Sequence, residues 1–258
     1  MRVLFIGVFA IAQFLASISM AQDDYTIAQQ RIAENLATAD VKLDLGDLID
    51  LTELPLEIVA LTHLENLVMG KALCNAAGCE RRGPAVQDLS LLRDLINLRH
   101  LDLGGNPVTD LSALTGLTNL QALYLIDTQV TDISDLAAMT ELLTLSLRHT
   151  GVTDLGPLAA LTKLETLYLS DTPLANLSAL SDMNLLWSVS LNNTFVTDLS
   201  PLHGLESLES VNLKNSLVTD LSPLIGLPKL RTLNIYDLQI SDHRQVIDLL
   251  NQGVNVRF

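Results

Sequence analysis

The residues with the clearest potential for chemistry lie around His149. Asp127 and Asp171 lie 22 residues before and after this histidine, and Ser146 and Ser170 are close by. A carboxylate can orient a catalytic imidazole, which in turn can activate a serine hydroxyl. The surrounding sequence supplies no nucleophile elbow and no oxyanion hole. A hydrolase that uses His149 is therefore the weakest of three functional hypotheses, and we name no catalytic residue.

Cys74 and Cys79 are the only two cysteines of the chain and lie five positions apart. In an exported protein, such a pair predicts a local disulfide bond. The alternative is half of a metal site, but no second cysteine pair and no clustered histidines accompany it. We expect the disulfide, with no bound metal and no cofactor.

A column of acidic or amide side chains recurs every 22 residues along most of the chain. Stacked calcium ligands would be one explanation. The other is structural, because Asp and Asn side chains accept backbone hydrogen bonds where turns begin. Repetition in every copy favours the structural explanation. The members of this column are Asp88, Asp110, Asp132, Asp154, Asn176, Asp198, Asp220 and Asp242.

These columns exist because the chain is a repeat array. An apolar-x-apolar triplet recurs with a 22-residue period. Its copies begin at Leu101, Leu123, Leu145, Leu167, Val189, Val211 and Leu233. The full pattern is L-x-x-L-x-L-x-x-T/N-x-V-T-D-L-S-x-L-x-x-L, and Leu98 to Leu117 is one copy. Each triplet predicts a short strand with inward leucines, and Ser200-Pro201 and Ser222-Pro223 predict capped helical turns.

The pattern resembles the 22-residue leucine-rich repeats of bacterial internalins, over roughly residues 43–242. The resemblance implies an α/β solenoid: an arc with one short parallel strand per repeat on the concave face and 3-10 or short helical turns on the convex face. Internalin-type repeats usually place Asn at a ladder position where this chain has Asn106 and then Thr128, Thr150, Thr172, Thr194 and Ser216. The threonine hydroxyls could form a ladder between repeats, with shorter reach.

The ends and one interruption complete the predicted organisation. We expect a helical cap within 22–42, with Ile27, Ile32, Ala33 and Leu36 at helical spacing over Asp24 to Thr38. Repeats then occupy 43–241, interrupted by a protruding loop at about 70–85 that contains both cysteines. A second cap follows at 242–258, where Val246, Leu249 and Leu250 precede Gly253 and an uncertain edge strand from Val254 to Phe258. Nine strands are expected in the repeats themselves.

The outward strand positions are the candidate interface, because the repeat period brings equivalent residues into rows about 4.8 Å apart. These rows place Tyr124, Ile126, Arg148 and Tyr168 in one patch, which we call the tyrosine patch. His100 and Asp102 lie beside it, and Trp187 lies towards its flank. Tyr, Trp and Arg are the residues that most often anchor protein interfaces. A later amide-rich stretch that includes Asn192, Asn212 and Asn234 is read as a solvated face.

The first residues resemble a secretory signal peptide over 1–21, with an apolar run from Val3 to Leu15 and a cleavage site at Ser19-Met20-Ala21. The run is too short to favour the alternative of a membrane anchor. A net charge of −15 repels nucleic acid and anionic membranes. We expect an exported, periplasmic or secreted monomer without stable membrane insertion. Its predicted function is to bind a protein ligand on the concave face without catalysis, and a structural spacer is the main alternative.

Overall fold

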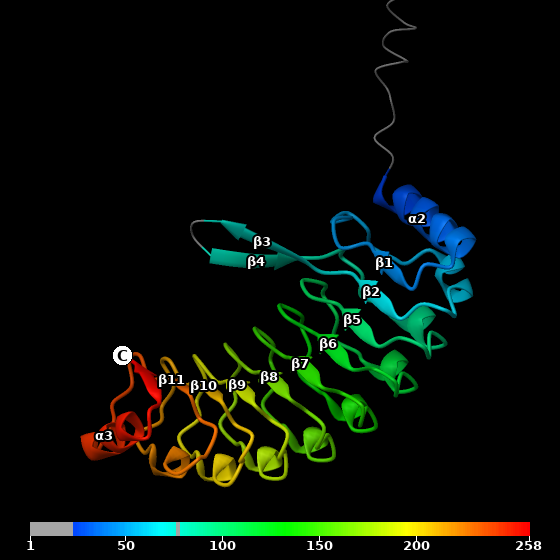
Figure 1. Ribbon diagram of the computed structural model, residues 1–258. Helices are drawn as coiled ribbons and strands as arrows, with labels where there is room; N and C mark the ends of the chain where they lie inside the picture. The colour runs from blue at the N-terminus through cyan, green and yellow to red at the C-terminus, as the bar shows by residue number, and fades with distance from the viewer. Residues whose placement is uncertain (1–22, 76–77) are drawn as a thin grey trace, which may run out of the picture.

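The computed structural model describes residues 23–75 and 78–258, and the side chains of 71–82 are outside the description. The chain winds into an arc whose inner face is a parallel sheet and whose outer face is a row of short 3-10 helices (Figure 1). This is the predicted α/β solenoid. The predicted signal peptide, residues 1–21, lies outside the described residues.

The sheet has ten strands in the order β1-β2-β5-β6-β7-β8-β9-β10-β11-β12. Their bounds are β1 Lys42–Asp44, β2 Asn66–Val68, β5 His100–Asp102, β6 Ala122–Tyr124, β7 Thr144–Ser146, β8 Thr166–Tyr168, β9 Ser188–Ser190, β10 Ser210–Asn212, β11 Thr232–Asn234 and β12 Asn255–Arg257. Nine of these are the predicted repeat strands. The tenth, β12, confirms the uncertain edge strand at the C-terminal end and pairs in parallel with β11.

Leucine spacing explains the core of each repeat. In one copy, Leu101 and Leu103 point inward from the strand, while Leu111, Leu114 and Leu117 pack from the convex side, and all five are buried. Equivalent residues of successive repeats stack into one continuous hydrophobic cluster. Burial of each leucine side chain contributes about 1.5–3 kcal/mol, so no repeat is stable without its neighbours.

The convex side consists of the 3-10 helices η1 Leu56–Ala60, η2 Ser90–Leu92, η3 Ser112–Leu114, η4 Ser134–Leu136, η5 Gly156–Leu158, η6 Ser178–Leu180, η7 Ser200–Leu202 and η8 Ser222–Leu224. The prediction that Ser200 and Ser222 act as N-caps is wrong. Each serine is the first helical residue, and the preceding Leu199 and Leu221 make no side-chain cap bond. The capping acceptor is instead the aspartate two residues before each serine.

That aspartate belongs to the repeating acidic column, whose structural role is confirmed. In each of its eight members, Oδ1 accepts a hydrogen bond from the backbone N–H two residues later, at 2.8 to 2.9 Å. Asn176 makes the same bond without a charge. The bonds explain why the column recurs once per repeat, because every turn has an amide that needs an acceptor.

The threonine column does not form the ladder between repeats that the sequence suggested. The hydroxyls of Thr128, Thr150, Thr172 and Thr194 each donate to the carbonyl three residues earlier in the same repeat, at 2.6 to 2.7 Å. The side chain is too short to reach the next coil. Only Asn106, the long amide of the column, bonds to a residue outside its own repeat.

The protruding loop that the sequence predicts at about 70–85 is an antiparallel hairpin. Strands β3 Lys71–Asn75 and β4 Gly78–Arg82 pair in a register that sets Cys74 opposite Cys79. The hairpin projects from the sheet on the concave side of the arc (Figure 1). Asn106 holds its base, because Nδ2 donates to Met69 O at 2.7 Å and Oδ1 accepts from Val86 N at 3.2 Å.

Helices close both ends of the solenoid, as predicted. Helix α2 Asp24–Thr38 begins after Asp23, whose Oδ1 accepts from Thr26 N, and α3 His243–Asn251 begins after Asp242. The buried residues of α2 are Ala28, Ile32 and Asn35. The predicted apolar stripe was partly wrong, since Ala33 and Leu36 of α2 and Leu250 of α3 are exposed. Within the described residues, no helix is both long and apolar enough to cross a membrane.

Candidate protein-binding face

The concave face is built from rows of side chains that point away from the core. The central row contains Asp102, Tyr124, Ser146 and Tyr168, which successive strand pairs bring into register. Tyr124 and Tyr168 are two strands apart, so their backbones are separated by about 10 Å. Both tyrosines are half-buried, and Ser146 on the strand between them is completely buried.

A second row runs beside the first and completes the tyrosine patch. Backbone bonds from Gly105 N to Ile126 O and from Asp127 N to Arg148 O show that Ile126 and Arg148 lie on neighbouring coils. Arg148 is exposed and Ile126 is half-buried. Because coils β6 to β8 contribute all four side chains, the patch joins residues up to 44 positions apart in the sequence.

The three flanking candidates have different positions. His100 is exposed at the start of β5, and Asp102 at its end accepts a bond from Gly104 N at 2.9 Å. Both therefore border the patch on the strand before Tyr124. Trp187 lies at the edge where the strands begin, just before β9, with 44% of its surface exposed. It is one coil beyond Tyr168 and so extends the patch along its flank.

The amide-rich stretch is more organised than a solvated surface. Asn192 Oδ1 accepts bonds from the hydroxyls of Ser170 and Ser190 and from Asn212 Nδ2. Lys214 lies over the ring of Tyr236, with Nζ 4.8 Å from the ring centre. The sequence placed these residues in rows, but it did not indicate that Asn192 joins three coils. This half of the face has side chains fixed by hydrogen bonds rather than by aromatic packing.

His149 belongs to a polar row along one edge of the face. Its Nδ1 lies 2.6 Å from Asp127 Oδ1 and its Nε2 lies 3.0 Å from Asp171 Oδ2. Asn193 and Asn215 continue the row through further side-chain hydrogen bonds. All five residues have positive φ, between 52° and 60°, a conformation in which Asn, Asp and His are several-fold enriched.

This arrangement gives the hydrolase hypothesis no support. Both ring nitrogens of His149 already contact carboxylates, Nδ1 at Asp127 and Nε2 at Asp171, rather than a serine hydroxyl. The Ser170 hydroxyl bonds to Asn192, and that of Ser146 is buried without a partner. In the described part of the chain, no group of three or more His, Cys, Asp or Glu side chains is arranged to hold a metal.

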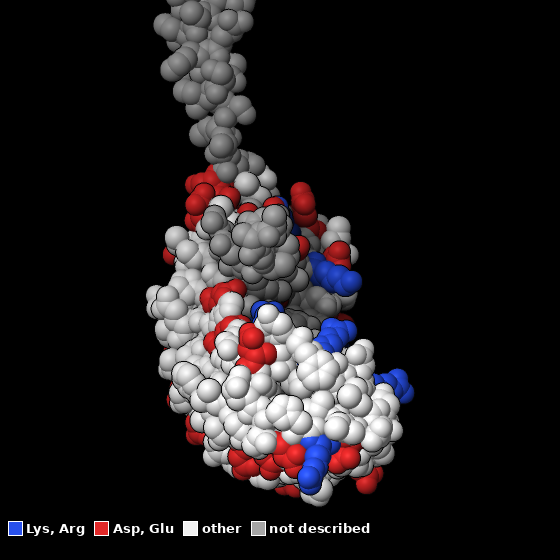
Figure 2. Space-filling model, turned by 90° about the vertical axis from the view of Figure 1, so that its left-hand side faces the viewer, with Lys and Arg blue, Asp and Glu red and all other residues white. Residues whose placement is uncertain are grey.

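Charge is segregated around the arc. Figure 2 looks onto the C-terminal end, where Asp and Glu gather mainly on the left-hand side and at the bottom and Lys and Arg on the right-hand side. From β6 to β12, no acidic residue occupies an outward strand position, whereas Arg148, Lys214 and Arg257 follow or end these strands. Acidic residues such as Glu165 and Glu209 directly precede these strands, and the outward strand positions themselves are neutral or basic in a chain of net charge −15.

Comparisons with known proteins agree with this geometry. A family model described as leucine-rich repeats matches residues 96–138 and 140–182. The crystal structure of an internalin, InlF, from Listeria monocytogenes is similar with a TM-score of 0.68 and 28% identity, over 89% of this chain and 73% of that one. The protein therefore contains leucine-rich repeats and is similar to an internalin in fold.

Two further structures share the solenoid. Internalin C2 from Listeria monocytogenes has a TM-score of 0.66 and 26% identity, over 82% of this internalin-like chain and 89% of its own. A leucine-rich repeat protein from Leptospira interrogans has the same fold, with a TM-score of 0.70 and 24% identity, over 81% of this chain and 52% of its own. A search of curated protein sequences found no match.

Arg257 is the residue of this internalin-like face that sequence reasoning missed. It lies on β12, which continues the sheet beyond the last repeat, and its backbone pairs with Asn234. The 22-residue period ends before helix α3, so the register of β12 cannot be read from the repeat. The one available signal was the alternation of Val254 and Val256, which places Arg257 on the outward side of the strand.

Proposed function

We propose that this protein binds a protein ligand on its concave face, with Tyr124, Ile126, Arg148 and Tyr168 as the anchoring residues. Leucine-rich repeats commonly mediate protein–protein interactions through extended concave surfaces. The observation that carries the proposal is the tyrosine patch itself. Its residues do not repeat, whereas the Asp and Thr columns that serve the scaffold recur in nearly every coil.

The physical argument is preorganisation. The patch is attached to strands whose inward leucines are fully buried, so the backbone beneath it is fixed before the ligand arrives. Binding to a rigid surface loses less conformational freedom than binding to a mobile loop. A half-buried tyrosine supplies a large apolar area and a polar hydroxyl at low cost in side-chain entropy.

We place this interaction outside the cytoplasm, in the periplasm or the medium, and we expect the protein to act as a monomer without an enzymatic role. Support for export comes from the sequence of residues 1–21 and from the cysteine pair. The internalin-like fold is consistent with a binding module. A spacer without a specific ligand is the second hypothesis, because any solenoid must expose some side chains on its concave face.

A comparative pull-down tests the proposal. The purified protein, a Tyr124→Ala/Tyr168→Ala variant and a control with Ile96→Ala/Leu185→Ala are each used to capture proteins from periplasmic and secreted fractions of the producing organism. The control removes two exposed apolar side chains from segments that connect a 3-10 helix to the next strand. We expect a partner that the wild type and the control retain and the tyrosine variant loses. Equal capture by all three would favour the spacer and contradict the proposal.

A further inference from the structure

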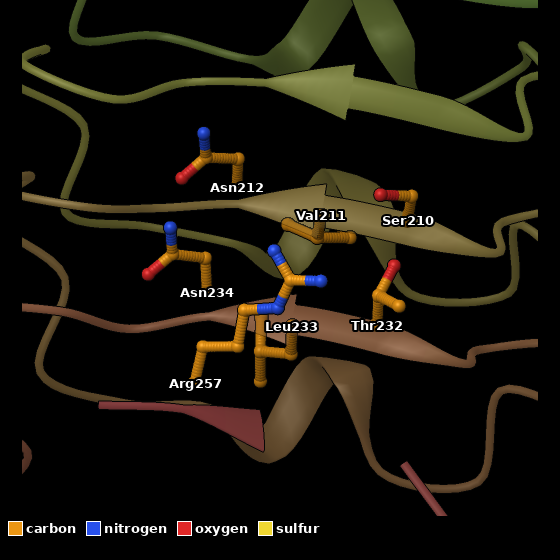
Figure 3. A pocket seen from close by; sticks show the side chains of 7 residues that line it. All are labelled: Ser210, Val211, Asn212, Thr232, Leu233, Asn234 and Arg257. Atoms are coloured by element: carbon orange, nitrogen blue, oxygen red, sulfur yellow. The ribbon is translucent and has the colours of Figure 1, made fainter. Parts of the chain in front are cut away.

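The last three strands of the sheet form a hollow of about 210 Å³ beyond the tyrosine patch. Its polar lining comes from Ser210 and Asn212 on β10, Thr232 and Asn234 on β11, and Arg257 on β12. Figure 3 shows the Arg257 guanidinium between the two asparagine amides on one side and the two hydroxyl groups on the other. Polar groups of three coils therefore border the same hollow.

Some hydrogen-bonding groups of this hollow are already in use. Asn212 Oδ1 accepts from Lys214 N, and Asn234 Oδ1 accepts from Tyr236 N. Asn212 Nδ2 donates to Asn192 Oδ1, and Thr232 Oγ1 donates to Glu209 O. The donors that remain without a partner among the described residues include the Asn234 amide and the Arg257 guanidinium.

Within the described residues, Arg257 forms no ion pair. The ion-paired Lys and Arg side chains are Arg31, Arg99, Lys163 and Arg231. The Arg257 guanidinium offers a planar set of N–H donors and no acceptor. Such a site is complementary to an anion with oxygen acceptors.

The electrostatic surroundings favour a single carboxylate over a polyanion. The residues that line the hollow include no Asp or Glu, so a bound negative charge meets no carboxylate in the lining itself. The polar row at the edge of the face, however, contains Asp127 and Asp171, and Asp237 has the same positive φ at the equivalent position one coil after Asn215. A polyanion that followed the sheet would run beside these carboxylates, whereas one carboxylate held at Arg257 would not.

We propose that this hollow binds the side-chain carboxylate of an Asp or Glu in the protein ligand, paired with Arg257. The proposal rests on the proposed function, because it assigns a second contact to the same ligand. It also sets a spacing. Tyr168 and Asn234 are three strands apart, or about 14 Å, which an extended peptide spans with about four or five residues. In the ligand, the acidic residue should therefore lie about four or five residues from the residue that contacts Tyr168.

Peptide selection followed by a double-mutant cycle tests the inference. A random peptide phage library is selected on the purified protein, and peptides that lose binding to the Tyr124→Ala/Tyr168→Ala variant are kept. Each Asp or Glu of these peptides is replaced by Asn or Gln. Dissociation constants are then measured with the wild type, with Arg257→Gln and with Arg244→Gln, a control on helix α3 that removes the same charge outside the concave face.

We expect one acidic residue in each peptide whose replacement weakens binding about tenfold or more, as for a charge-assisted hydrogen bond. Arg257→Gln should abolish that dependence, and Arg244→Gln should preserve it. Thermal unfolding of Arg257→Gln checks that the exposed edge strand still folds.

Peptides that depend on the tyrosines but tolerate loss of every acidic residue would overturn the inference and leave the proposed function intact. So would an acid dependence that persists in Arg257→Gln. A selection that yields no tyrosine-dependent peptide would instead overturn the proposed function and this inference with it.

Discussion

At the scale of single residues, the repeat separates side chains that build the coil from those that differ between coils. The amide of Asn106 is the informative exception in the ladder column, because its neighbours in the column are threonine or serine. It bonds Met69 on one side of the hairpin and Val86 on the other. The sequence shows that Asn106 differs from the rest of the column, but only the structure shows why. The inserted hairpin separates Met69 from Val86, and Asn106 bonds the carbonyl of the first and the amide of the second.

Asn106→Thr should therefore destabilise the protein although it restores the consensus residue of the column. A threonine hydroxyl reaches its own repeat only, so Met69 O and Val86 N lose a buried partner, at about 1–3 kcal/mol. Urea denaturation measures the loss, and hydrogen exchange at the Val86 amide locates it. Thr172→Ser, which keeps its bond within the repeat, is the control. Equal stability of Asn106→Thr and wild type would show that Asn106 does not hold the hairpin base.

The acidic column also has a pH consequence. Hydrogen bonds from the serine two residues later, by its backbone N–H and its side chain, lower the pKa of five members: Asp88, Asp110, Asp132, Asp198 and Asp220. A carboxyl whose pKa is lower in the folded state stabilises the fold above the unfolded pKa of about 3.9, and this contribution is lost as the pH falls through the folded pKa. Stability should therefore decline below about pH 4.

Replacing these five aspartates with asparagine isolates the effect, because Asn176 shows that an amide oxygen makes the same turn bond. Between pH 6 and pH 3, the urea concentration at the midpoint of unfolding should fall less for the variant than for the wild type. An identical acid sensitivity would mean that other carboxylates control it.

At the scale of elements, the strands, turns and terminal helices could be predicted because each follows from local periodicity. The hairpin could not, since its two strands have neither the 22-residue period nor an extended alternating pattern. Strand β12 was only partly predictable, because its place in the sheet depends on how α3 packs at the end of the solenoid. In the site, the positions of Tyr124 and Tyr168 could be predicted from the repeat period. The hydrogen bonds of Asn192 and the position of Arg257 could not, because they depend on how neighbouring coils pack in three dimensions.

The hairpin register sharpens the disulfide prediction. Cys74 and Cys79 are directly opposite in an antiparallel pair, where Cα atoms are about 4.5–5.5 Å apart, within the range that a disulfide spans. We predict that thiol titration of denatured, unreduced protein from an oxidising compartment finds no free thiol. Two free thiols per chain would contradict both the bond and the argument for export that it supports.

At the scale of the whole molecule, the arc has a continuous parallel sheet on its concave face and a row of short 3-10 helices on its convex face. The strands fix where each outward side chain lies, the buried leucines fix the strands, and the end helices cover the core. In the function that we propose, specificity depends on the few concave residues that differ from coil to coil.

The affinity of a captured partner for the concave face tests this account most directly. Dissociation constants are measured for the wild type, for Tyr124→Ala/Tyr168→Ala and for the control variant Ile96→Ala/Leu185→Ala. We predict a loss of about 30-fold or more for the tyrosine variant, as for interface hot spots of at least 2 kcal/mol, and less than a twofold change for the control. Equal affinities of all three proteins would contradict the assignment of the tyrosine patch as the binding site.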